Sequence, residues 1–107
     1  MIANVTLELV LCAGKEYPSF MPVCVYKDLE LPSAPFVGLN IFDSIVKLET
    51  KLIVEEVTYD TDSKKYTATI ILEGFTDRDQ AIAFARMGAD YHGWYHYLDI
   101  NANFHNI

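Results

Sequence analysis

Apolar and polar residues alternate along residues 4–12, NVTLELVLC, and this alternation constrains the fold more than any other feature of the chain. Successive side chains of an extended chain point to opposite sides. One side of this segment is therefore apolar, formed by Val5, Leu7, Leu9 and Leu11. Asn4, Thr6 and Glu8 fall on the other side. This period of two is typical of a half-buried β-strand, so the segment predicts a sheet with one side in the core.

Three further segments have an extended pattern, at residues 22–31, 46–59 and 66–75. The polar sequence DTDSKK lies between the last two, which predicts a β-hairpin. Within residues 46–59 the apolar positions change parity after Glu55 and Glu56. A strand absorbs such a change with one extra residue, so we expect a β-bulge near residues 54–56, or two strands joined there.

Residues 32–42 contain Pro32 and Pro35, and each proline removes a backbone donor that a central strand needs. We therefore expect an extended connection in this part of the chain. Its apolar residues are expected to pack against the core: Phe36, Val37, Leu39, Ile41 and Phe42. The alternative is an exposed docking loop.

One helix is predicted late in the chain, in TDRDQAIAFARMG. Thr76 can cap its N-terminus, and Gly88 is a natural C-terminal stop. We therefore predict a helix near residues 77–88, followed by a final strand near residues 91–99, whose aromatic residues favour strands. The predicted fold class is α+β, an antiparallel sheet of four to five strands with one helix packed on it near the C-terminal end, in a single domain of residues 1–107.

The charge balance excludes one class of partner. The 107 residues contain 15 acidic and 8 basic residues, a net charge of -7. Nucleic-acid binding draws most of its affinity from Lys and Arg, so DNA and RNA are not expected partners, whereas a basic protein surface is. No 18 apolar residues run together, and no basic region precedes the apolar N-terminal segment. We therefore expect a cytoplasmic protein without membrane contact.

The run DYHGWYHYLD at residues 90–99 contains two histidines four positions apart, His92 and His96. On a helix their Cβ atoms would lie about 6 Å apart, close enough to share a zinc ion. On a strand they would be separated by about 13 Å, at a rise of about 3.3 Å per residue. Gly93 also stands where zinc proteases place their general base. We therefore predict no metal or cofactor; the alternative is a metal site at His92, His96 and Asp99.

As a strand, the same run carries aromatic side chains on both faces. His92, Trp94 and His96 share one face, and Tyr91, Tyr95 and Tyr97 share the other. Tyr and Trp are enriched at protein interfaces, so we predict an interaction surface that supports self-association. The alternative is that these aromatic residues pack in the core. A second predicted surface, for a basic partner, consists of the hairpin carboxylates Glu55, Glu56, Asp60 and Asp62, for which a merely solvated face is the alternative.

The sequence contains no Gly-rich phosphate loop, no Gly-x-Ser-x-Gly and no Cys-x-x-Cys. No residue is therefore assigned a catalytic role. We expect a small acidic, non-catalytic protein-interaction domain that self-associates; by analogy, such a domain suits an inhibitor, an immunity protein or a phage or mobile-element accessory factor. The alternative is an enzyme or a metal- or small-ligand-binding protein with a His, Asp and Trp site in residues 90–99.

Overall fold

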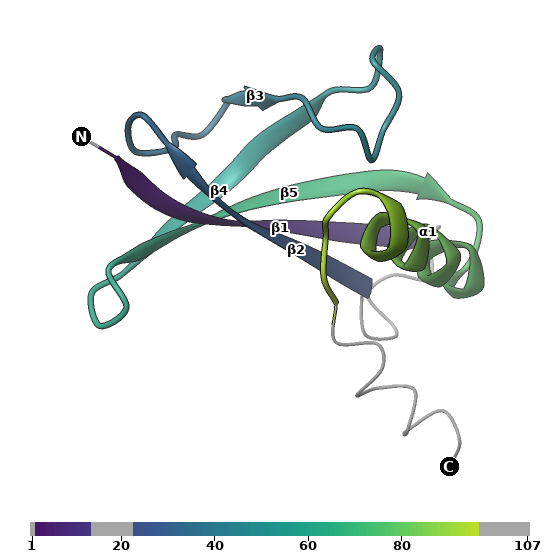
Figure 1. Ribbon diagram of the computed structural model, residues 1–107. Helices are drawn as coiled ribbons and strands as arrows, with labels where there is room; N and C mark the ends of the chain where they lie inside the picture. The colour runs from purple at the N-terminus through teal and green to yellow at the C-terminus, as the bar shows by residue number, and fades with distance from the viewer. Residues whose placement is uncertain (1, 14–22, 97–107) are drawn as a thin grey trace.

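The computed structural model describes residues 2–13 and 23–96, which form a five-stranded sheet and one helix (Figure 1). The elements are β1 (Ala3–Ala13), β2 (Val23–Leu31), β3 (Asn40–Ile41), β4 (Leu52–Asp60), β5 (Lys65–Phe75) and α1 (Arg78–Tyr91). The predicted α+β class is confirmed, with the helix packed on the sheet late in the chain.

The strand order is β2-β1-β5-β4-β3. Two antiparallel pairs, β1 with β2 and β4 with β5, lie side by side through β1 and β5, which run parallel. The sheet is therefore mostly antiparallel, with one parallel pair at its centre. The short strand β3 adds only two residues to the outer edge of β4. Within residues 2–13 and 23–96, most of β4 thus forms an edge of the sheet.

The core lies on one side of the sheet and follows from the alternation in β1. Val5, Leu7, Leu9 and Leu11 are all buried, as the sequence predicts. The helix α1 lies across one end of the sheet (Figure 1) and adds the small buried residues Ala81 and Ala85 to the same core cluster. Small residues allow the helix axis to approach the strands closely.

The predicted hairpin and bulge are both confirmed. Strands β4 and β5 pair antiparallel around a turn at residues 61–64, where Lys64 adopts a positive φ of 59°. The register shifts between Val54 and Glu56, inside the predicted range. The predicted start of this strand at residue 46 is wrong, because β4 begins at Leu52. Residues before it form turns, including one closed by a hydrogen bond from the Thr50 N–H to the Lys47 carbonyl, 2.9 Å.

The helix has different ends from those predicted. Asp77, not Thr76, is the N-cap, and its carboxylate accepts a hydrogen bond from the Gln80 N–H at 2.8 Å. Gly88 does not end the helix but lies buried inside it, and the helix continues to Tyr91. The glycine that follows the helix end is Gly93, with a φ of 78°, a conformation that glycine adopts without steric cost. Within the described residues, no helix is long and apolar enough to cross a membrane.

Candidate interaction surface

The aromatic run is not a strand in its described part. Asp90 and Tyr91 complete α1, His92 is its C-cap, and only Tyr95 pairs in strand fashion, in a single antiparallel bridge with Tyr26 of β2. The prediction of a strand near residues 91–99 is therefore wrong up to residue 96. Tyr97 and Asp99 lie outside the described residues.

Trp94 belongs to the core. Its exposed fraction is 3%, and its indole Nε1–H donates a hydrogen bond to Asp43 Oδ1 at 2.9 Å. The Lys27 ammonium lies 5.5 Å from the centre of the same ring, within range of a cation–π contact. For Trp94, core packing is thus the correct interpretation, and its ring is not part of an exposed surface.

Asp43 is the centre of the polar contacts around Trp94. Its second carboxylate oxygen accepts from Lys27 Nζ at 2.6 Å, and Oδ1 also accepts from the Ile45 N–H at 3.0 Å. Burial by itself raises the pKa of Asp43, but the hydrogen bonds from Lys27, Trp94 and the Ile45 N–H outweigh it and leave the pKa lowered. Lys27 also donates to the His92 carbonyl at 2.9 Å. These contacts fix the segment after α1 against β2.

The two histidines are positioned by protein contacts. His92 Nδ1 lies 2.8 Å from Ser44 Oγ, which places this ring on the loop after β3. In residues 2–13 and 23–96 there is no group of three His, Cys, Asp or Glu side chains that could hold a metal ion. The alternative site at His92, His96 and Asp99 includes a residue outside that part of the chain, so it stays a prediction.

Tyr91 and Tyr95 are exposed but lie in different environments. Tyr91 stands at the end of α1 with an exposed fraction of 79%. Tyr95 stacks on Tyr26, with ring centres 5.6 Å apart, and its hydroxyl lies 3.3 Å from Asp28 Oδ1. Trp94, which lies between Tyr91 and Tyr95 in the sequence, is buried. The described aromatic residues therefore do not form one continuous face.

The four predicted hairpin carboxylates are all exposed, on β4 and in the turn that follows it. Glu55, Glu56 and Asp60 belong to β4, Asp62 follows in the turn, and all four are exposed. The pKa of Asp60 is lowered, chiefly because the Asp62 N–H donates to its carboxylate at 2.9 Å. These residues lie on the part of β4 beyond β3, where the strand is at the edge of the sheet.

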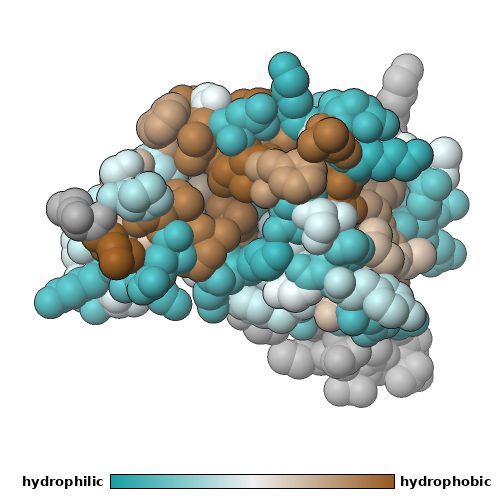
Figure 2. Space-filling view, turned by 45° about the horizontal axis from the view of Figure 1, so that its top comes forward, coloured by the Kyte–Doolittle hydropathy of each residue, from teal (hydrophilic) through white to brown (hydrophobic). Residues whose placement is uncertain are grey.

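The structure also exposes apolar residues of the loops around β3, some of which were expected to pack against the core. Leu39 and Ile41 pack against the core, as predicted, but their neighbours do not. Four large side chains on the loops that flank β3 are more than half exposed: Phe36 (58%), Val37 (66%), Phe42 (63%) and Leu48 (80%). The prediction that Phe36, Val37 and Phe42 pack against the core is wrong. We call these four residues the apolar surface. Figure 2 shows hydrophobic residues, in brown, gathered around a hollow on one face of the molecule.

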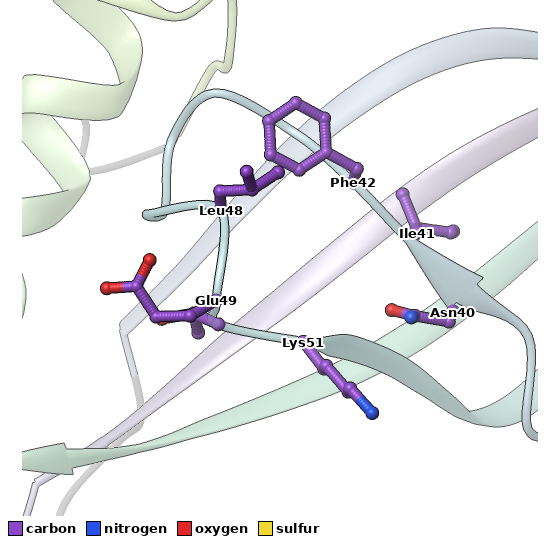
Figure 3. Close-up of a pocket in the computed structure, with 7 residues that line it drawn as sticks. Asn40, Ile41, Phe42, Leu48, Glu49 and Lys51 are labelled. Carbon is purple, nitrogen blue, oxygen red and sulfur yellow. The ribbon is translucent and has the colours of Figure 1, made fainter.

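A pocket of about 280 Å³ lies beside Phe42 and Leu48. Its walls are Asn40, Ile41, Phe42, Leu48, Glu49, Thr50 and Lys51. Figure 3 shows Phe42 and Leu48 next to one another at one end of the pocket, with Glu49 pointing away from them. The site thus combines protruding apolar side chains with a recess and with charged groups at its rim.

Comparison with known proteins adds no relative to this description. No protein family, curated protein or solved structure matches the chain. The function must therefore be argued from the surfaces of the molecule itself.

Proposed function

We propose that this chain is a small, acidic, non-catalytic protein-interaction domain of the cytoplasm, and that the apolar surface is its principal contact. The observation that carries the proposal is the exposure of Phe36, Val37, Phe42 and Leu48 on the loops that flank β3, two of which, Phe42 and Leu48, line a pocket. Folded proteins rarely leave a large contiguous apolar patch in water unless it contacts another molecule. Covering these side chains would remove apolar area from water, which is the main source of association energy.

The charge distribution supports a second role for the acidic surface. The carboxylates of Glu55, Glu56, Asp60 and Asp62 project from β4 and its turn, away from the core. A net charge of -7 attracts a basic protein over long range and repels nucleic acid. These groups are thus a second contact, for a basic partner, separate from the apolar surface. Such a division suits proteins that act by binding, as inhibitors and immunity proteins do.

Photo-crosslinking tests the location of the contact. Benzoylphenylalanine placed at Phe42 in the full chain, produced in its own cells, is expected to form a covalent adduct with a protein on irradiation. The matched control is the same probe at Ile2, which is 65% exposed and belongs to the start of the chain. A second probe at Tyr91, 79% exposed, tests the aromatic run.

Adducts from position 42, with none from position 2, support the proposal. Adducts from position 91 alone would place the contact on the aromatic run and contradict the apolar surface as its location. Equal labelling from all three positions would indicate random collision and would also count against it.

A further inference from the structure

We infer that the partner that covers the apolar surface is a second copy of this chain, an inference that rests on the proposed function of this surface as a protein contact. It narrows that function in two ways. It names the occupant, and it requires the surface to be complementary to itself, because a two-fold contact uses the same patch on both chains.

The charges around the apolar surface favour a second copy over a basic partner. Residues 36–53 contain two acidic residues, Asp43 and Glu49, and two basic ones, Lys47 and Lys51, so this segment has no net charge. The chain as a whole has a net charge of -7, and the excess of negative charge therefore lies elsewhere. Two copies that approach through this face meet at a segment without net charge, whereas a basic partner is attracted to the carboxylates of β4.

The shape of the site also suits a two-fold contact. Leu48 protrudes with 80% of its surface exposed, and the pocket of about 280 Å³ adjoins it. A two-fold axis beside Leu48 allows each copy to insert its protruding side chain beside the other's Phe42. The contact thereby buries the apolar side chains of both copies and fills both recesses.

The rim charges add a specific pairing. Lys47, Glu49 and Lys51 are exposed, and none of them forms an ion pair within the described part of the chain. Figure 3 shows Glu49 directed away from Phe42 and Leu48 while Lys51 lies on another wall of the pocket. Across a two-fold axis, Glu49 of one copy is then available to a lysine of the other. Such exposed pairs contribute little energy but help to set orientation.

Sedimentation velocity on the purified full chain, from about 1 µM to about 1 mM, tests the inference. We expect a monomer–dimer equilibrium. Leu48→Asp is expected to weaken it at least about 30-fold, since it places a charge in the apolar contact. Ile2→Asp and Tyr91→Asp, at positions 65% and 79% exposed outside the apolar surface, are expected to leave it unchanged. Circular dichroism checks that each variant is folded.

A charge exchange provides an independent readout. Glu49→Lys and Lys51→Glu are each expected to weaken the dimer about 2- to 5-fold, as rim charge pairs do. The double variant that carries both changes restores opposite charges across the axis and is expected to return to the affinity of the unchanged chain. If the double variant instead shows the sum of the two single losses of dimer affinity, the proposed pairing is overturned.

The outcomes also separate this inference from the proposed function. A chain that stays monomeric to about 1 mM, or a dimer that Tyr91→Asp breaks and Leu48→Asp does not, overturns the inference. If that monomer still forms adducts with another protein from position 42, the proposed function stands and only the identity of the partner is wrong. If position 42 yields no adduct either, both fail.

Discussion

Asp43 joins three parts of the chain that are far apart in sequence. Asp43 lies in the loop after β3, and its carboxylate accepts hydrogen bonds from Lys27 of β2 and from Trp94 after α1. Neither Lys27 nor Asp43 stands out in the sequence, because each is an ordinary charged residue until the fold brings them together. The sequence does single out Trp94, but as part of a strand, since local aromatic composition cannot reveal a partner 51 positions away.

The lowered pKa of Asp43 makes a prediction about stability and pH. A carboxyl whose pKa is lower in the folded than in the unfolded state stabilises the fold above its unfolded pKa, which is about 3.9. That stabilisation is lost as the pH falls through the folded pKa. Asp43→Asn is therefore expected to lower the free energy of unfolding by about 1–3 kcal/mol near pH 7, and the deficit should shrink in acid. Urea denaturation of both proteins at several pH values measures it.

A different result would identify a different role for this carboxylate. If the deficit of Asp43→Asn stays constant from neutral pH to below about 3, the loss comes from replacing an acceptor oxygen by an amide donor and not from the ionised charge. Asp79→Asn on the exposed side of α1 is a suitable reference for the general effect of removing one negative charge.

At the scale of elements, alternation is a reliable guide in β1 and β5 but not at residues 46–51. The segments around β1 and β5 alternate over most of their length, and both strands form as predicted. Residues 46–51 alternate too, yet they form turns, and Leu48 faces solvent. Alternation shows which residues share a side, but it does not show whether a second layer covers that side. This is why the apolar surface could not be predicted.

Gly88 shows the same limitation in the helix. The sequence suggests a helix stop, but the structure uses this glycine for close contact: a Cβ added there would lie 2.5 Å from Ile45 Cδ1 and 3.3 Å from Ile45 Cγ1. Ile45 is itself buried beside Trp94 in the core cluster. Glycine is thus required by the packing of a loop residue that no local pattern connects to the helix.

This contact predicts that Gly88→Ala destabilises the protein, contrary to the usual rule. In a helix interior the change normally gains about 1 kcal/mol from helix propensity. Here the added methyl group displaces a buried side chain, and overpacking of this kind costs about 1–3 kcal/mol. We therefore expect a net loss of order 1 kcal/mol in the free energy of unfolding, measured by urea denaturation.

The matched test uses Ile45→Val, which removes the Cδ1 atom that the new methyl group would meet. In that background Gly88→Ala is expected to become neutral or stabilising, so the sign of the effect changes. An equal loss in both backgrounds would show that the methyl group meets something other than Ile45.

At the scale of the whole molecule, the described part of the sheet has an edge along β4 that carries acidic residues. The strand β3 pairs with only two residues of β4, Leu52 and Ile53. Beyond it, β4 carries the exposed residues Glu55, Glu56 and Asp60. Exposed strand edges invite pairing with another chain, and natural sheets prevent this with charged side chains. That these carboxylates belong to one hairpin follows from the sequence, because they lie within a few residues of one another.

The negative charges of β4 can be removed with almost no change in the shape of the side chains. In the variant Glu55→Gln, Glu56→Gln and Asp60→Asn, three carboxylates on β4 are replaced by amides. The matched control neutralises three exposed carboxylates elsewhere, Glu73→Gln, Asp79→Asn and Asp90→Asn, so that both variants have the same net charge. Both are made with Leu48→Asp in addition, which removes association through the apolar surface from the comparison.

The β4 variant is expected to associate faster than its control, by light scattering at equal concentration. Antiparallel pairing of two β4 edges centred on Thr58 would place Glu56 of one copy opposite Asp60 of the other, and like charges at such positions oppose pairing. The amides remove this repulsion at the edge itself, whereas the control removes only the same amount of long-range charge. Added salt is also expected to speed association of the chain with unaltered β4 carboxylates, because salt screens their repulsion. The screening length falls from about 10 Å at 0.1 M to about 3 Å at 1 M. Equal association of the two variants would show that net charge, and not the position of these carboxylates, keeps the edge free.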